Sequence, residues 1–293
     1  MPEYPDITIY IERLRAFLQG QTLQQVRLIN PFLLRTVEPP IASIKNREVL
    51  GFERFGKRIV FDLSNDLFLI LHLMISGRLH WRESGAKIPA KIGLAALDFS
   101  NGTLLITEAG TKKRASLHLV KGRSELMNFD SGGLEIFETN FEKFRERLIS
   151  ENHTLKRVLT DPSFFSGIGN AYSDEILHRA KLSPIQLTQK MTDLQIEQLY
   201  NGTRETLIEW TDRLRTETGD RFPEKVTAFH KEMAVHGRYK KPCPNCGAPI
   251  QRIRYATNET NYCPQCQTDG RLLADRALSR LLKKDWPRRI EEL

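Results

Sequence analysis

The stretch SGIGNAYSDEIL, residues 166–177, places two glycines and an asparagine between two helical patterns. The pattern before it is HTLKRVLTDPSFF (153–165), and the next one begins inside the stretch itself. Gly167 and Gly169 allow backbone N–H groups and the Asn170 amide to face one side, beside a helix N-terminus. Such an arrangement can bind phosphate oxygens without reading base sequence. An ordinary glycine turn would have the same letters, so both interpretations stay open at this point.

Helical patterns continue on both sides of this turn. GLEIFETNFEKFRERLIS (133–150) lies upstream and DLQIEQLYNGTRETLIEWTDRLRTE (193–217) lies downstream, with apolar residues at helical spacing. Residues 130–240 are therefore expected to form a helical domain. Near its end, TETGDRFPEKVTAFH (216–230) is rich in turn residues and is expected to be a mobile loop.

The residues before this domain indicate strands behind a single helix. Strand patterns such as KRIVFDL (57–63) and TLLIT (103–107) recur over residues 21–125, and Asn101-Gly102 is typical of a two-residue hairpin. Many short strands with turns between them favour a β-sandwich or a barrel. In front of the strands, a helix beginning near Asp6 has one apolar face: Ile7, Tyr10, Ile11, Leu14, Phe17 and Leu18. The fold class expected is α+β with several domains.

All four cysteines lie in one segment, CPNCGAPIQRIRYATNETNYCPQC. Cys243 and Cys246 form one C-x2-C pair, and Cys263 and Cys266 form another. Two such pairs can hold one tetrahedral Zn²⁺. Two disulfides or a redox pair would use the same residues, but a reducing compartment disfavours disulfides, and the lack of other cysteines favours a dedicated metal site. We expect a zinc finger over 241–270 with one structural zinc ion.

Composition narrows the class of protein. The chain has 293 residues, 40% of them hydrophobic and 27% charged, which is typical of globular proteins with room for more than one domain. Lys and Arg number 44 against 36 Asp and Glu, and the resulting net charge of +8 fits a polyanionic partner such as nucleic acid. No apolar run reaches the roughly 18 residues of a membrane span, and no secretory signal pattern is present. We expect a cytoplasmic, nucleoid-associated protein with no membrane partner.

The first six residues, MPEYPD, raise the possibility of a reactive N-terminus. If Met1 is removed, Pro2 carries the α-amino group and Glu3 follows directly. An α-amino group titrates near pH ~8, against ~10.4 for lysine, and an unprotonated amine can attack an electrophilic carbon. The alternative is a frayed, inert terminus. The helix that begins directly behind these residues favours an ordered terminus, because its buried face and positive dipole end hold the same place.

Five features in chain order resemble the formamidopyrimidine-DNA glycosylase / endonuclease VIII family: MPE at the start, RFGKRIVFDL, LHLMISG, GIGNAYSDE and CPQCQ. The resemblance extends over nearly the whole chain. It implies an N-terminal catalytic β-sandwich domain over 1–125, a helix-two-turn-helix DNA-binding domain over 130–240 and the zinc finger, leaving 271–293 as a helical extension. It also implies a monomeric DNA repair enzyme, both glycosylase and abasic-site lyase, that flips a damaged base out of double-stranded DNA and excises it.

The resemblance assigns the chemistry to three residues. Pro2 corresponds to the family's nucleophile, whose amine attacks C1′ of the deoxyribose and forms a Schiff base that leads to β-elimination. Glu3 corresponds to the general acid/base that assists ring opening. Lys57 corresponds to a lysine that contacts phosphate near the lesion and aids elimination, although a solvated strand end would look the same.

The resemblance also assigns DNA-binding residues. Asn170 corresponds to the phosphate-binding asparagine. Lys156 corresponds to a basic residue on the preceding helix, although an exposed helix charge is almost as good an interpretation. Ile75 stands where the family has the methionine that fills the gap left by the flipped base, and Met74 lies beside it.

The chain departs from the family pattern on the zinc hairpin. Asn258 stands where the family has an arginine that grips phosphate and serves the second elimination, and Arg252 and Arg254 on the same hairpin could replace its charge. We therefore expect β-elimination to be retained and δ-elimination to be weak.

Further departures lie in the N-terminal domain. TEAGTKKRASLHL (107–119) lacks the family's aromatic wedge, although Lys112, Lys113 and Arg114 could supply charge, and a second family glutamate is Asp6 here. These departures support an alternative function, a non-catalytic binder of damaged or structured DNA on the same scaffold. Pro2 and Glu3 oppose it, because a binder has no use for a free N-terminal amine.

Overall fold

A computed structural model describes residues 1–224, 226, 229–255, 258–282 and 287–292 of the chain. Its contacts divide the chain into two compact units. The first contains Met1–Ser131 and Trp210–Thr227, and the second contains Gly132–Glu209 and Ala228–Leu293. Over the described residues, no helix is both long enough and apolar enough to cross a membrane.

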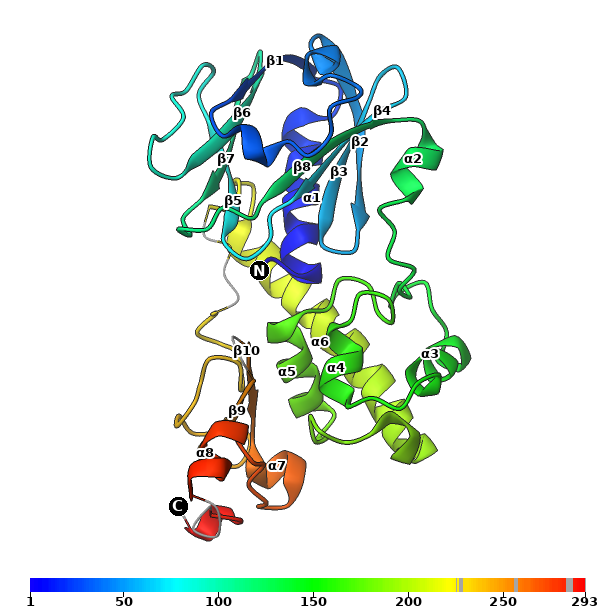
Figure 1. Cartoon of the computed structure of the whole chain (residues 1–293), viewed down its shortest axis with the longest axis vertical. Coiled ribbons are helices and arrows are strands. Elements are labelled where there is room, and N and C mark those ends of the chain that lie inside the picture. The colour runs from blue at the N-terminus through cyan, green and yellow to red at the C-terminus, as the bar shows by residue number, and fades with distance from the viewer. Residues whose placement is uncertain (225, 227–228, 256–257, 283–286, 293) are drawn as a thin grey trace. The chain divides into compact units, whose positions relative to one another are not determined.

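The end of α6 (Asp193–Thr218), from Trp210 on, belongs to the first unit, which otherwise has one helix followed along the chain by eight strands and a short helix (Figure 1). These elements are α1 (Tyr4–Leu18), β1 (Thr22–Leu28), β2 (Arg47–Phe55), β3 (Arg58–Leu63), β4 (Leu67–His72), β5 (Gly77–Arg82), β6 (Gly93–Phe99), β7 (Gly102–Glu108), β8 (Ser116–Lys121) and α2 (Arg123–Met127). Two 3-10 turns, η1 (Pro31–Leu33) and η2 (Ile41–Ile44), lie between β1 and β2. The helix predicted near Asp6 is confirmed and begins two residues earlier, at Tyr4.

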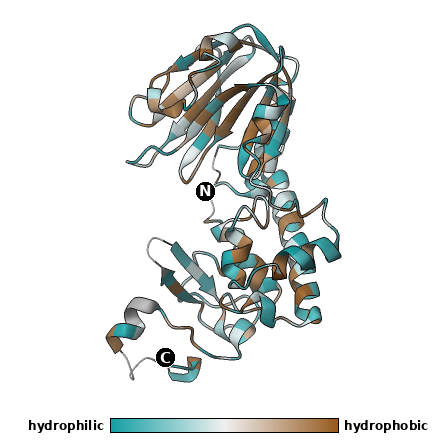
Figure 2. Cartoon of the chain, turned by 45° about the vertical axis from the view of Figure 1, so that its right-hand side comes forward, coloured by the Kyte–Doolittle hydropathy of each residue, from teal (hydrophilic) through white to brown (hydrophobic). Residues whose placement is uncertain are grey.

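The strands form one hydrogen-bonded sheet in the order β5-β7-β6-β1-β2-β3-β4-β8, with antiparallel neighbours. β1 and β2 share only the pairs Thr22–Glu48 and Leu23–Arg47, so the sheet consists of two halves. Apolar side chains from both halves belong to one core cluster, which means that the halves pack face to face as the predicted β-sandwich. In Figure 2 hydrophobic residues run along the strands of this unit.

Helix α1 closes one side of this core. Ile7, Tyr10, Leu14 and Leu18 are each fully buried, as their helical spacing predicts, and α1 lies against β2 and β3. Burial of four such side chains stabilises the helix by roughly 1.5–3 kcal/mol each before entropy is counted. The residues directly before α1 are therefore held in place rather than frayed.

The predicted hairpin between β6 and β7 is present, but its loop is shifted by one residue. Phe99 pairs with Gly102, so Ser100 and Asn101 form the turn. A Cβ atom on Gly102 would lie 2.2 Å from Cζ2 of Trp81, and only glycine allows this close approach.

The segment predicted to be a mobile loop, 216–230, is anchored in its described part. Phe222 is buried and its ring lies 6.0 Å from the ring of Tyr10. Glu224 pairs with Arg82 (2.6 Å) and His80 (2.8 Å) on β5. Lys225, Thr227 and Ala228 lie outside the described residues, so the prediction is not addressed there.

The second unit contains the helices and the four cysteines. Its elements are α3 (Phe141–Ile149), α4 (Leu155–Thr160), α5 (Asn170–Arg179), η3 (Thr188–Lys190), the first part of α6 (Asp193–Thr218), β9 (Gln251–Tyr255), β10 (Asn258–Tyr262), α7 (Pro264–Thr268), α8 (Arg276–Leu282) and η5 (Ile290–Glu292). The helix expected over 133–150 begins only at Phe141, because Asn140 caps it by accepting the Lys143 N–H. In the described part of the C-terminal extension (270–282 and 287–292), the helical elements are α8 and the 3-10 turn η5.

Candidate functional site

The N-terminus occupies a buried position ahead of α1. Pro2 is buried, and Glu3 has 2% of its surface exposed. Glu3 is the N-cap of α1, and its backbone N–H donates to the Asp6 carboxylate at 2.8 Å. The α-amino group and the Glu3 carboxylate therefore lie at the positive end of the helix dipole.

Four charged side chains, Glu3, Asp6, Arg78 and Lys57, act electrostatically on the α-amino group, which Met1 carries in this structure and Pro2 would carry after its removal. Burial lowers the pKa of the amine below 8.0. Glu3 acts against this, and the cations Arg78 and Lys57 add to it. A lowered pKa leaves more of the amine unprotonated at neutral pH, as nucleophilic attack requires. Arg78, on β5, was missed in the sequence because its strand pattern does not distinguish it from a solvated arginine.

Asp6 is the second carboxyl group of this site. Burial raises its pKa to about 7, the Glu3 N–H opposes the rise, and the Glu3 carboxylate adds to it. Asp6, which stands where the family has a longer glutamate, is therefore partly protonated near neutral pH.

The stability of the protein should depend on Asp6 in a defined pH window. The pKa of this carboxyl is raised in the folded state, so its contribution is fully present below the unfolded value near 3.9 and is lost as pH rises through about 7. Asp6→Asn keeps an acceptor for the Glu3 N–H and cannot ionise. Between pH 4 and pH 8 we expect the unfolding free energy of the wild type to fall by roughly 2–4 kcal/mol more than that of Asp6→Asn. Urea unfolding of both proteins across this range measures the difference, and parallel pH profiles would contradict it.

His72, at the end of β4, is a further polar group and lies opposite Arg58 of β3 in the sheet. Burial lowers its pKa to about 4, with Arg58, Lys57 and His118 adding to the shift, so the imidazole is neutral at neutral pH. Its Nε2 has no hydrogen-bond partner among the residues described. Its sequence context does not identify it, because a histidine at the end of an apolar strand is typical of a core residue.

The turn between β4 and β5 presents Ile75, which is 55% exposed. The next residue, Ser76, donates its hydroxyl to the buried carboxylate of Glu108 at 3.2 Å, and the same group accepts the Arg114 N–H at 2.8 Å. Lys113 turns back and donates to the Glu108 carbonyl. The buried Glu108 carboxylate therefore connects the turn that holds Ile75 to Arg114, within the segment 107–119 that lacks the family's aromatic wedge.

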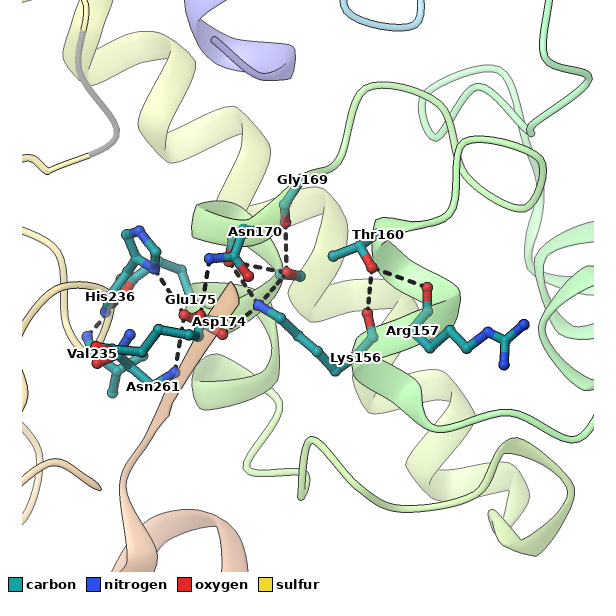
Figure 3. Close-up of polar contacts among 12 residues, drawn as sticks. Lys156, Arg157, Thr160, Gly169, Asn170, Asp174, Glu175, Val235, His236 and Asn261 are labelled. Carbon is teal, nitrogen blue, oxygen red and sulfur yellow. Dashed lines mark hydrogen bonds and ion pairs between the residues drawn. The ribbon is translucent and has the colours of Figure 1, made fainter. Parts of the chain in front are cut away.

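In the second unit, Asn170 begins α5 and reaches the zinc hairpin, because its Nδ2 donates to the Glu259 carbonyl of β10 at 2.9 Å. Lys156 points inward: its Nζ donates to the Asn170 carbonyl and to Ser173 Oγ, each at 2.7 Å, and pairs with Asp174 (Figure 3). The Lys156 side chain is 14% exposed. The ammonium group therefore supports the position of Asn170, and the interpretation as an exposed helix charge does not apply.

Two adjacent carboxylates on α5 connect it to the segment before the cysteines. Asp174 is fully buried and accepts hydrogen bonds from His236 Nδ1 at 2.8 Å and from the Asn261 N–H at 3.1 Å (Figure 3). Glu175 accepts three backbone N–H groups, those of Ala234, Val235 and His236. Neighbouring acids on a predicted helix suggest surface charge, so the sequence pattern gives no sign of either contact.

The zinc hairpin, β9 and β10, carries less free charge than its arginines suggest. Arg252 and Arg254 share the Glu259 carboxylate, at 3.1 and 3.4 Å, and Arg252 also lies over the Tyr239 ring at 4.0 Å. Asn258 is exposed at the start of β10. The exposed position at this end of the hairpin thus has a neutral amide.

The four cysteines form a zinc site. The Sγ atoms of Cys243, Cys246, Cys263 and Cys266 all lie within 4.8 Å of one another. The separations of 3.4 Å (Cys246–Cys263) and 3.9 Å (Cys243–Cys266) exclude disulfide bonds and match the edges of a tetrahedron with Zn–S bonds of about 2.3 Å. The expected structural zinc is thus confirmed.

Loss of zinc should unfold this part of the chain. Structural zinc contributes roughly 10–16 kcal/mol in small zinc domains, and Cys263 is fully buried. We expect Cys263→Ser, or chelation of the wild type, to abolish zinc retention and amide protection over 240–268. The β-sandwich should keep its protection. Hydrogen exchange with a metal assay measures both, restored protection on adding zinc is the control, and a protected hairpin without metal would contradict the prediction.

Three family models match the chain in order. They are the formamidopyrimidine-DNA glycosylase N-terminal domain over residues 1–113, the H2TH domain of the same enzymes over 134–217, and the zinc finger found in FPG and IleRS over 240–268.

Whole proteins match over most of their length. A formamidopyrimidine-DNA glycosylase of Thermus thermophilus is 31% identical over 279 residues, covering 92% of this chain and 100% of the relative. One from Heliobacterium modesticaldum is 29% identical, covering 91% and 100%. Among solved structures, the Lactococcus lactis Fpg bound to abasic-site DNA has a TM-score of 0.79 at 25% identity, covering 91% of this chain and 99% of that one. MutM bound to DNA containing carbocyclic 8-oxo-G has a TM-score of 0.80 at 25% identity, covering 91% and 100%.

Proposed function

The chain belongs to the formamidopyrimidine-DNA glycosylase family, and we propose that it is a DNA repair glycosylase that also cleaves the abasic site it creates. The observation that carries the proposal is the buried start of the chain ahead of α1, where Pro2 and Glu3 are buried and the charges of Arg78 and Lys57 act on the α-amino group that Met1 carries here. The damaged-DNA complexes of the structural relatives support duplex DNA as the substrate. The net charge of +8 supports the same partner.

The proposed reaction begins with the nitrogen of Pro2, freed when Met1 is removed. Its lone pair forms a bond to C1′ as the bond from C1′ to the damaged base breaks, and the base leaves with a proton. Glu3 protonates the ring oxygen O4′, so the sugar opens and an iminium links Pro2 to C1′. The Glu3 carboxylate, having given its proton to O4′, accepts a C2′ proton as the C3′–O bond breaks and the 3′ phosphate leaves, and hydrolysis of the iminium by water then releases Pro2. Arg78 and Lys57 offset the negative charge of phosphate groups near the reacting sugar.

Borohydride trapping tests this proposal. Borohydride reduces an iminium to a stable amine, so the protein should become covalently attached to an oligonucleotide containing an abasic site. A panel of lesion duplexes then identifies the base that is excised. Tight binding without any adduct would overturn the enzymatic proposal and favour the non-catalytic binder.

The products on abasic DNA should stop at β-elimination. The second elimination needs proton transfer near the phosphate, and the amide of Asn258 cannot transfer protons as a charged or titratable group can. We expect Asn258→Arg to raise the yield of 3′-phosphate product by about tenfold or more. Gel separation of the two products measures this, with Asn258→Gln as the matched control. Abundant 3′-phosphate product from the wild type would contradict the prediction.

A further inference from the structure

The chain beyond the zinc finger is folded onto it. Leu273 donates its N–H to the buried Tyr262 hydroxyl at 2.7 Å, and the Asp275 carboxylate accepts the Arg254 N–H of β9 at 3.1 Å. Leu272 and Leu273 are buried, and α8 lies beside β9 (Figure 1). This segment, which we call the C-terminal extension (residues 270–292, of which the structure describes 270–282 and 287–292), begins beyond the last family model, which ends at residue 268.

The last residues of the extension hydrogen-bond to its first residues. Leu272 donates its N–H to the Arg288 carbonyl and Ile290 donates to the Gly270 carbonyl, each at 2.8 Å. Arg271 and Arg289 thus pair as an isolated antiparallel bridge. Arginines from two ends of the segment therefore lie on one small folded element.

The extension concentrates positive charge. Its sequence has seven basic residues against four acidic ones, in a protein whose net charge is +8. Among the acids of its described part, Asp275 is buried and accepts a hydrogen bond from β9, Glu291 pairs with Arg289 at 3.2 Å, and Glu292 accepts the Arg288 N–H at 2.7 Å.

Three guanidinium groups remain exposed on the extension, each without a carboxylate partner among the residues that the structure describes: Arg271, Arg280 and Arg288. Guanidinium groups bind phosphate oxygens in a bidentate manner. The adjacent zinc hairpin offers less positive charge to a phosphate, because Arg252 and Arg254 share Glu259 and Asn258 is neutral.

We propose that the C-terminal extension is a second contact surface for the DNA phosphate backbone, supplying cations that the zinc hairpin lacks. This inference rests on the proposed function, since it takes duplex DNA as the partner. Contacts of this kind add affinity and salt dependence but no sequence reading.

The test compares full-length variants on a duplex with a tetrahydrofuran abasic-site analogue, which cannot form an iminium. We expect R271Q/R280Q/R288Q to weaken binding at low salt by about 10–100-fold and to reduce the slope of log K against log salt by about 2–3. K45Q/K87Q/K91Q removes three exposed lysines of the first unit and is the matched control. On a separate duplex with a natural abasic site, single-turnover cleavage at saturating protein should not change.

The possible results distinguish failure of this inference from failure of the proposed function. A triple variant that binds with wild-type affinity and slope overturns the inference, as does a control that loses as much. Wild-type protein that fails to bind the duplex counts against the proposed function instead. Zinc content and thermal unfolding establish that the variant is folded. If the triple variant does not fold, Arg280→Gln alone decides, with an expected decrease of about 0.9 in the slope and no decrease overturning the inference.

Discussion

Protein that keeps any residue in front of Pro2 should lose base excision and borohydride trapping by on the order of 1000-fold or more. A preceding residue turns the Pro2 nitrogen into an amide, whose lone pair is delocalised into the carbonyl and cannot attack C1′. No side chain of the site is altered. The measurement is single-turnover excision and adduct yield, with intact mass defining the first residue of each preparation.

Two controls separate chemistry from folding in this experiment. Removal of the extra residue from the same preparation should restore activity. Affinity for the tetrahydrofuran duplex should change much less than activity, because phosphate contacts do not require the free amine. Normal strand cleavage by protein whose mass shows Met1 attached would refute Pro2 as the nucleophile.

The parts of the fold that repeat at a regular spacing were predictable from the sequence. The apolar face of α1 follows the helical period, and its residues Ile7, Tyr10 and Leu14 are fully buried. The cysteine spacing predicted the zinc site, because a C-x2-C pair places two thiolates on one turn. Both patterns depend on near neighbours, which a sequence displays directly.

The polar contacts between distant residues were not predictable. Lys156 looked like a helix surface charge, yet it pairs with Asp174, which in turn pairs with His236 sixty-two positions further on. Glu224 likewise anchors its segment through Arg82, 142 positions earlier. Such pairs depend on which elements pack together, and no local pattern records that.

Replacing Glu3 by glutamine should slow base excision by about 100–10,000-fold while the protein stays folded. Glutamine has the same size and keeps the backbone N–H that donates to Asp6 at 2.8 Å, but it cannot protonate O4′. Removing one anion from the helix N-terminus costs only about 0.3–1 kcal/mol. Loss of the Glu3 charge should also lower the pKa of Asp6, because that charge raises it.

Glu12 provides the matched control on the same helix. Its carboxylate pairs with Arg215 at 2.7 Å and is partly exposed, so Glu12→Gln should change stability by less than about 1 kcal/mol and leave excision unaltered. Single-turnover rates and unfolding free energies of the two variants together distinguish a proton-transfer role from a helix-capping role. If Glu3→Gln excised bases within threefold of the wild type, ring opening would need a different acid, and Asp6, with a pKa of about 7, would be the residue to test next.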